Sequence, residues 1–451
     1  MRKRFLAIAL LCPLLLLGGC GNAGKGFIRP LDVLLCPPYA NEQLEQLERK
    51  LAELQDRQAS LGAQLRFHHA RSGDYRDAVT MLDLNGDEKE EAISFYTSTP
   101  LPQTEKRATL AVFVKKTNGD ESWKPFEIAG DGVTILSLAF PRLQTGQRGI
   151  LVNWENENNE RSFGLYHFTG DALRALAVQR CSMLRVCDFD GDGTDEIAYM
   201  HFTGAETVPT ATILRYDAAL NQALLLESTV GQAYLSPLRT FLGATPLPLN
   251  NSGNALLVDA LRENAQGEPD VTTFLLSLER VEPKAPETQY TFAPHVDMLQ
   301  GIGRFVPLPV RDINNDGLPE LPAAYIPPGW QTRLLRWHSV RRSGPTKWVP
   351  EAFGDAALFL DGVRWIALPE DLVQGLVIQE TQTEQARELR FMQRKEDGTA
   401  GEELLRMKIT VPDGAVVIEA LTEAGQAAGI TPDFINAIHS EENLYILPGK
   451  N

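Results

Sequence analysis

From about residue 61 onward, apolar and polar positions alternate mostly with a period of two, a pattern typical of β-strands. Six apolar stretches each follow a turn and precede a pair of hairpin-like strands. They are EAISFY from 91, GILVNW from 149, EIAYMHF from 196, ALLVDAL from 255, ELPAAYI from 320 and GLVIQE from 375. The pattern therefore predicts an all-β fold built from a repeated unit of about four strands.

Repeated four-stranded units of this length are typical of a β-propeller, in which each unit forms one blade. No unit has enough residues to bury a core of its own, so a chain of separate small sandwiches fits less well. The remaining strands LGAQLRFHH near residue 61, AVVIEAL from 415 and LYILP from 444 could together complete a seventh unit. We predict a propeller over residues 61–451 with six or seven blades, and the choice stays open.

A different period precedes the strands. In residues 41–60, Leu44, Leu47, Leu51 and Leu54 recur on one helical stripe, and Asn41 can cap its start. This pattern predicts an amphipathic helix. Packing on the main body is favoured over a coiled coil with a partner, because the apolar repeat is short.

The first nineteen residues have the composition of an export signal. MRKR is basic, and the thirteen-residue stretch FLAIALLCPLLLL is apolar but short for a bilayer-spanning helix, which needs about 20 residues. Leu17, Gly18, Gly19 and Cys20 resemble the lipobox of bacterial lipoproteins. The resemblance implies removal of residues 1–19, lipid attachment at Cys20, a tether over 20–40, and a location on the extracytoplasmic face of a bacterial membrane. An ordinary secretory signal or an uncleaved anchor is the alternative.

Charge and cysteine content narrow the class of partner. Removing residues 1–19, with their three basic side chains, takes the formal charge from −16 to −19. An acidic chain argues against a nucleic-acid partner, because phosphate binding requires clustered Lys and Arg. Cys36, Cys181 and Cys187 would then be the unmodified thiols, and an odd number makes a disulfide framework unlikely. We interpret Cys181 and Cys187 as small buried apolar residues.

Three acidic stretches share one spacing: DLNGDEKEE from 83, DFDGDGTDE from 188 and DINNDGLPE from 312. Each places an oxygen-bearing side chain at positions 1, 3, 5 and 9. These residues are Asp83, Asn85, Asp87 and Glu91 in the first loop, Asp188, Asp190, Asp192 and Glu196 in the second, and Asp312, Asn314, Asp316 and Glu320 in the third. The repetition indicates a shared function of the loops.

Like charges at this density resist burial unless a cation lies among them, and Ca²⁺ takes six to eight oxygen ligands. At position 7, Lys89, Thr194 and Leu318 differ in side chain, which fits a ligand contributed by the backbone carbonyl. An EF-hand requires a glutamate at position 12, where Ser94, Tyr199 and Ala323 stand instead. The sequence therefore predicts two or three structural calcium sites in loops between strands.

These loops resemble the FG-GAP or VCBS repeats of integrin-like β-propellers, over roughly residues 75–410. The resemblance implies that a D-x-D/N-x-D-G-x-x-E loop joins two strands of a blade and binds calcium. Together with the lipobox, it suggests a VCBS-repeat lipoprotein, a group that carries no assigned activity. The first loop departs from the pattern because Glu88 replaces the glycine at position 6, so its backbone is either strained or looser.

No linear motif of a nucleophilic, metallohydrolase or nucleotide-binding site occurs in the sequence. The stretches WENENNE, 154–160, and YIPPGWQ, 325–331, are candidates for loops that line a recognition surface. Two functions follow. The first is a non-catalytic binding or scaffolding module for a protein or glycan, and the alternative is a propeller hydrolase or lyase whose site is built from several blades.

Overall fold

A computed structural model describes residues 42–60, 64–99, 107–115, 123–202, 210–229, 238–249, 253–263, 269–281, 291–299, 304, 308–342, 348–360, 363–410, 415–430 and 439–440. The chain divides into two compact units, one with residues 1–61 and 115–123 and the other with residues 62–114 and 124–451. The signal peptide, Cys20, the tether over 20–40, Cys36, Asn41 and LYILP lie outside the described residues. Within the described part of the chain, no helix has both the length and the apolar character to cross a bilayer.

The predicted amphipathic helix is confirmed as α3 (Glu42–Ser60). Leu47 and Leu54 are buried, and Leu51 is half-buried, which agrees with the leucine stripe in the sequence. Two short helices occur later in the chain, α4 (Glu370–Gly375) and α5 (Glu423–Ala427).

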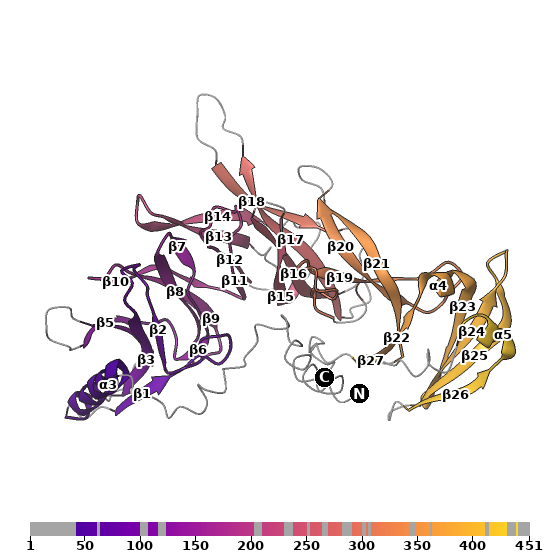
Figure 1. Cartoon of the computed structure of the whole chain (residues 1–451), viewed down its shortest axis with the longest axis horizontal. Helices are drawn as coiled ribbons and strands as arrows, with labels where there is room; N and C mark the ends of the chain where they lie inside the picture. Colours follow the sequence, from indigo (N-terminus) through magenta and orange to yellow (C-terminus); the bar gives the residue numbers. More distant parts are fainter. Residues whose placement is uncertain are drawn as a thin grey trace, which may run out of the picture. The chain divides into compact units, whose positions relative to one another are not determined.

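The described strands of the larger unit form six antiparallel sheets that follow one another in sequence (Figure 1). The first three sheets contain the following strands. The first has the order β1 (Gln64–His68), β3 (Glu91–Thr99), β4 (Thr109–Lys115), β5 (Trp123–Ala129), with β2 (Val79–Leu82) also on β3. The second has the order β10 (Leu173–Arg180), β9 (Arg161–Phe168), β8 (Gln147–Glu155), β6 (Thr134–Ala139), with β7 (Arg142–Gln144) also on β8. The third has the order β11 (Met183–Cys187), β12 (Glu196–His201), β13 (Thr210–Asp217), β14 (Gln222–Thr229).

The other three sheets repeat the same antiparallel order. The fourth contains β15 (Leu238–Pro248), β16 (Asn254–Glu263), β17 (Pro269–Val281) and β18 (Thr291–Met298). The fifth contains β19 (Glu320–Tyr325), β20 (Leu334–Arg342), β21 (Trp348–Phe359), β22 (Arg364–Leu368) and β27 (His439–Ser440). The sixth contains β23 (Leu376–Gln382), β24 (Ala386–Arg394), β25 (Ala400–Thr410) and β26 (Val416–Leu421).

The predicted repeat corresponds to these sheets. The six apolar stretches that defined it become β3, β8, β12, β16, β19 and β23, each in a different sheet. The strands considered for a seventh unit are used elsewhere, because β1 pairs with β3 in the first sheet and β26 pairs with β25 in the sixth. The described strands thus provide six units, and the all-β class is confirmed.

Consecutive sheets share their hydrophobic cores. Phe95 of the first sheet packs edge to face against Trp154 of the second, with ring centroids 5.7 Å apart. Phe163 of the second sheet packs in the same way on Tyr199 of the third, at 4.9 Å. One further cluster joins the third and fourth sheets, another the fourth and fifth, and another the fifth and sixth. Burial between sheets therefore replaces the separate core that no single unit could form.

A buried ion pair ties the fourth sheet to the segment that leads into the third acidic loop. Asp259 on β16 accepts hydrogen bonds from the Thr273 hydroxyl at 2.6 Å and from the Val310 amide at 3.3 Å. Arg304 lies 2.5 Å from the same carboxylate, and its side chain is fully buried. Both charges are therefore neutralised inside the protein, as buried ions must be.

Candidate functional site: three acidic loops and a polar groove

The three acidic loops occupy equivalent places in their sheets, each at the turn of a β-hairpin. The residue before position 1 pairs with the glutamate at position 9 in all three, as Leu82 with Glu91, Cys187 with Glu196 and Arg311 with Glu320. The glutamate in each case begins the outgoing strand. These flanks, strands on both sides of the first two loops and a bridge residue and a strand around the third, confirm that the loops are not EF-hands, which are flanked by helices.

The aspartate at position 1 organises each loop by accepting two backbone hydrogen bonds. In the second loop, Asp188 Oδ1 accepts from the Gly191 amide at 2.7 Å, and Oδ2 accepts from the Gly193 amide at 3.1 Å. The same pattern recurs at Asp83, with the amides of Gly86 and Glu88 at positions 4 and 6. Asp312 also accepts two amides, but they belong to Asp316 and Gly317 at positions 5 and 6. Carboxylates that accept hydrogen bonds from backbone amides form strong bonds, so these contacts hold each loop in its conformation.

Positions 3 and 5 repeat a second common feature, in which each side chain accepts a hydrogen bond from the amide two residues later. Asp190 accepts from the amide of Asp192 at 3.2 Å, and Asp192 from that of Thr194 at 2.8 Å. The corresponding bonds at 2.8–3.0 Å involve Asn85, Asp87, Asn314 and Asp316 as acceptors. Position 7 supplies the last of these amides in each loop, through Lys89, Thr194 and Leu318.

The glutamate at position 9 is buried in all three loops, at most 1 % exposed. One of its oxygens accepts from the amide at position 2, Leu84 at 2.9 Å, Phe189 at 2.9 Å and Ile313 at 3.0 Å. Burial raises the pKa of Glu91 to about 7 and that of Glu196 to about 8, and it also raises the pKa of Glu320. A buried carboxylate beside other acids is costly without a cation, because desolvation and repulsion both disfavour its charge.

The backbone at position 6 is left-handed in every loop. Its φ is 65° at Glu88, 87° at Gly193 and 87° at Gly317. Only glycine adopts this region without cost. Of the two possibilities for the first loop, the structure therefore shows a strained backbone at Glu88, and the loop keeps the same hydrogen bonds as the others.

The second loop brings its carboxylates closest together. Ligand atoms of Asp188, Asp190 and Glu196 all lie within 4.8 Å of one another. Glu196 Oε1 is buried and makes no hydrogen bond, so a hard cation would fit this oxygen-rich donor set. The guanidinium of Arg215 on β13 lies against the same group, 2.8 Å from Asp190, 2.7 Å from Asp192 and 3.7 Å from Glu196.

Turns without acidic ligands pack against the first two acidic loops. At the start of β8, the Arg148 amide donates to the Leu84 carbonyl at 2.9 Å, and a side chain on Gly86 would collide with the Gly146 carbonyl in the turn before this strand. In the same way, the amide of Asn254, the first residue of β16, donates to the Phe189 carbonyl at 3.3 Å. The amide at position 2 thus binds the glutamate of its own loop, while the carbonyl at position 2 binds the next sheet.

A salt bridge strengthens the contact between the second sheet and the second loop. Arg142 on β7 binds the Asp195 carboxylate through Nη2 at 2.9 Å and through Nε at 3.2 Å. The two residues also exchange backbone contacts, because the Asp195 amide donates to the Arg142 carbonyl at 2.8 Å. The first two acidic loops therefore connect neighbouring sheets as well as forming hairpin turns.

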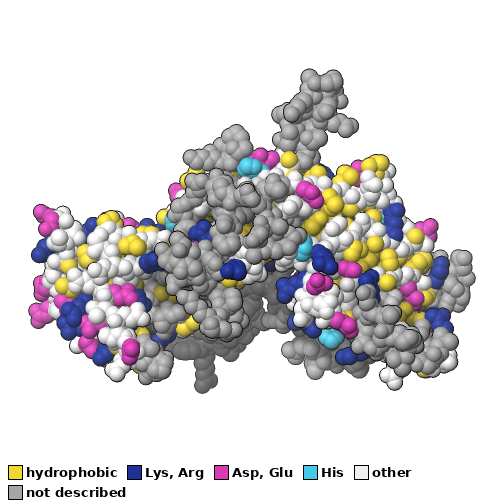
Figure 2. Space-filling view, turned by 180° about the vertical axis from the view of Figure 1, so that it is seen from behind, with side chains coloured by type: hydrophobic (Ala, Val, Ile, Leu, Met, Phe, Trp, Pro, Cys, Tyr) yellow, Lys and Arg dark blue, Asp and Glu magenta, His cyan; other side chains and the backbone are white. Residues whose placement is uncertain are grey.

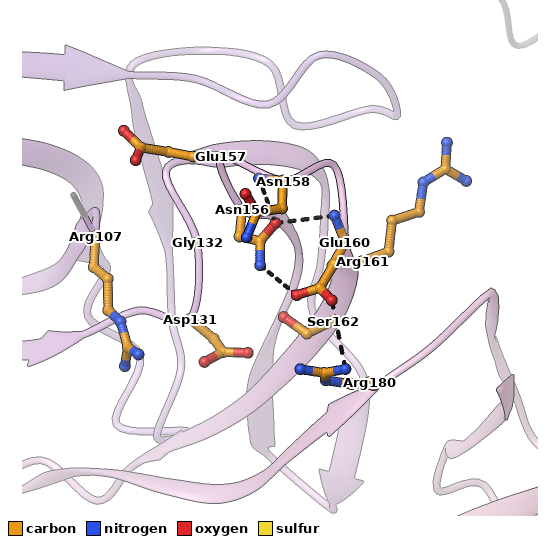
Figure 3. Close-up of a pocket in the computed structure, with 10 residues that line it drawn as sticks. All are labelled: Arg107, Asp131, Gly132, Asn156, Glu157, Asn158, Glu160, Arg161, Ser162 and Arg180. Carbon is orange, nitrogen blue, oxygen red and sulfur yellow. Dashed lines mark hydrogen bonds and ion pairs between the residues drawn. The ribbon is translucent and has the colours of Figure 1, made fainter. Parts of the chain in front are cut away.

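A polar hollow of about 340 Å³ lies beside the loop that joins β8 to β9 (Figure 3). Figure 3 shows the side chains of Arg107 and Arg180 on either side of Asp131, whereas Arg161 points away from the hollow. Its lining residues are Arg107, Asp131, Gly132, Asn156, Glu157, Asn158, Glu160, Arg161, Ser162 and Arg180. Almost every group that faces this space can donate or accept hydrogen bonds.

The loop that borders the hollow is held by its own hydrogen bonds. Asn156 Oδ1 accepts from the amides of Asn158 and Glu160, both at 2.9 Å, and Asn156 Nδ2 donates to Glu160 Oε2 at 2.8 Å. Arg180 Nη1 lies 3.6 Å from Glu160 Oε1. The carboxylate of Glu160 is thus positioned from both sides while it remains half exposed.

A second hollow, of about 490 Å³, continues from the first and shares Glu160, Arg161 and Arg180 with it. It extends past the ends of sheets two and three to His201 and to Thr240 of the fourth sheet. We call the two hollows together the polar groove.

Of the two loops that the sequence suggested for recognition, one lines the polar groove and the other contains a buried residue that packs between sheets. Residues 156–160 of WENENNE line the polar groove, which agrees with that interpretation. In YIPPGWQ, Trp330 is only 6 % exposed and donates from Nε1 to the Leu376 carbonyl at 2.7 Å, so it joins the fifth sheet to the sixth. Arg107, Asp131, Arg180 and Arg215 belong to no local motif, because only the fold brings them to these sites from separate segments of the chain.

Cys181 and Cys187 are confirmed as buried free thiols. Burial raises the pKa of each to about 12, so neither is suited to nucleophilic chemistry.

No protein-family model matches this sequence, and no curated protein is significantly similar to it.

Proposed function

We propose that the protein is a membrane-anchored lipoprotein whose calcium-stabilised β-sheets present a non-catalytic binding site for a glycan. The six sheets would be the blades of an FG-GAP or VCBS-type propeller. Two features support this: each sheet holds one copy of the repeat, and each packs on the next through a shared core. The first and sixth sheets would meet to close the ring.

The calcium proposal rests on the equivalence of the three loops. Each has the same acceptor pattern at positions 1, 3 and 5, and each adds a buried glutamate whose charge needs a cation. The ligands would be the oxygens predicted from the sequence. When bound, calcium would neutralise the carboxylates. The chain itself would supply the preformed loop, the strand that begins at the buried glutamate, such as Glu91 or Glu320, and the contact to the next sheet.

The observation that carries the binding proposal is the polar groove. Its lining combines carboxylates, amides, guanidinium groups and hydroxyls around a space within the range of small-ligand sites, about 300–1,000 Å³. Protein interfaces instead have apolar cores rich in aromatic side chains. Sugar hydroxyls both donate and accept hydrogen bonds, so an oligosaccharide matches this lining better than a protein surface does.

The groove and the acidic loops lie at opposite ends of the same strands. β12 begins at Glu196 of the second loop and ends at His201 in the groove. β8 begins beside Gly146, which contacts the first loop, and ends at Glu155, next to the groove loop. Calcium would therefore act by fixing the sheets that carry the groove, and it would not contact the ligand.

The surface charge is consistent with this class of partner. On the face that Figure 2 displays, the described Lys and Arg side chains are interspersed with Asp and Glu. A nucleic-acid partner would require a continuous basic surface.

The test of the groove is binding of the full chain, in detergent, to a panel of neutral and uronic-acid oligosaccharides. We expect Arg180→Ala and Glu160→Ala to weaken the best ligand about tenfold or more, since a hydrogen bond to a charged group contributes about 1.5–3 kcal/mol. Arg341→Ala is the matched control, because Arg341 is an exposed arginine paired with Glu351 on the fifth sheet. Unchanged affinity in both groove variants would contradict the assignment of the groove.

The anchor has a separate test. Cys20→Ser should abolish labelling by a palmitate analogue and move the protein from the membrane fraction to the soluble fraction. If this variant kept both the lipid label and the membrane association, the lipoprotein assignment would be wrong.

A further inference from the structure

Arg215 places a positive charge inside the second acidic loop. It lies on β13, the strand next to β12, and its Nη2 is 2.8 Å from Asp190 Oδ2 and 2.7 Å from Asp192 Oδ2. Its Nε is 3.7 Å from the buried Glu196 Oε1, which makes no hydrogen bond. One guanidinium thus faces three of the four acidic side chains that were predicted to bind calcium.

The other two loops have no such group at the same place. Ile197 pairs with Leu214, so Glu196 is opposite Arg215. In the first sheet, Ala92 pairs with Phe113, so Glu91 is opposite Val114. In the fifth sheet, Glu320 pairs with Ser339. Neither an apolar nor a hydroxyl side chain can neutralise the carboxylates of its loop.

The sequence shows a matching difference in the ligands. The second loop has aspartate at position 3, Asp190, whereas Asn85 and Asn314 stand there in the other two. The loop with the extra negative charge is therefore the loop with the arginine. A guanidinium keeps its charge at all ordinary pH values and offers five donors, so it can satisfy several carboxylates together.

We propose that Arg215 is a tethered cation that occupies the place of calcium in the second loop, so that this loop closes without metal. The inference rests on the proposed calcium sites and divides them. The first and third loops require calcium, while the second, with its contacts to Arg142 and Asn254, stays closed when calcium is withdrawn. Chelation of calcium would then not weaken the contacts that the second loop makes with the neighbouring sheets.

The test counts calcium ions bound per full chain by equilibrium dialysis against radioactive calcium, in detergent. Arg215→Ser copies the residue of the third loop, and Arg215→Gln is a second neutral variant that keeps most of the side-chain stem. We expect two ions in the wild type and three in both variants. We also expect the variants to melt below the wild type in EDTA and to regain stability when calcium is added, because only they lack a cation in the second loop.

The outcomes separate this inference from the calcium proposal. Three ions in the wild type, or the same number in the wild type and both variants, would overturn the role of Arg215. No ion in the wild type but one in the variants would support Arg215 and contradict calcium binding at the first and third loops. Asp312→Asn is the control, and it should remove one ion from the wild type and from each variant.

Discussion

At the scale of single residues, the first acidic loop shows how far sequence departures can be tolerated. Glu88 adopts a left-handed φ of 65° yet still donates its amide to Asp83 at 2.9 Å. The same conformation at Gly193 and Gly317 carries no Cβ, and nothing lies within 4 Å of where one would stand. At position 6, the first loop therefore differs from the other two in its backbone strain, and a Cβ at this position meets no neighbouring atom in the second and third loops.

This strain can be measured directly. Glu88→Gly should raise the free energy of unfolding by roughly 1 kcal/mol, since a residue with a Cβ pays roughly 1–2 kcal/mol for the left-handed region and glycine loses part of this gain to entropy in the unfolded chain. Gly317→Ala should lower the free energy by a similar amount. Chemical denaturation of both variants compares them, and a destabilised Glu88→Gly protein would show that Glu88 makes a contact worth more than the strain.

At the scale of elements, the sequence predicted the strands well because the apolar stretches are long and each follows a turn. The hairpin turns of the three acidic loops were predicted too, since the residues that define each loop lie within nine consecutive positions. Arg215 could not be predicted, because only the register between β12 and β13 brings it to Glu196. Only part of the groove was predicted: the loop over 156–160 was a candidate from the sequence, whereas Arg107, Asp131 and Arg180 reach the groove from other segments of the chain.

The fourth and fifth sheets depend on a contact that no local pattern revealed. Asp259 and Arg304 are both buried, and the carboxylate also holds the Val310 amide two residues before the third loop. A buried pair of this kind contributes little by its presence, but the loss of one partner leaves an uncompensated charge inside the protein.

We therefore expect Asp259→Ala to destabilise the protein by about 3–5 kcal/mol. Arg341→Ala, which breaks the exposed pair with Glu351, should cost at most about 1 kcal/mol. The shift of the denaturant midpoint measures both. Equal midpoints for the two variants would show that Arg304 does not depend on Asp259 for its charge.

At the scale of the whole molecule, the acidic loops and the polar groove lie at opposite ends of the strands. The first two acidic loops contact the sheets that follow them, and the polar groove crosses the opposite ends of the first four sheets. Under the proposed function, such an arrangement would let the groove vary without altering the contacts between the sheets. On the proposed extracytoplasmic face, calcium affinities of about 10⁻⁴–10⁻³ M would suffice.

The central claim is that calcium stabilises the first and third acidic loops and the sheets that carry them, and the melting temperature of the full chain tests it. At a calcium concentration one hundredfold above Kd, each site contributes about 2.7 kcal/mol, so EDTA should lower the melting temperature by several degrees and added calcium should restore it. A double variant, Asp83→Asn with Asp312→Asn, should melt at the same temperature with and without calcium. A wild-type protein that melts identically in calcium and in EDTA would contradict the account.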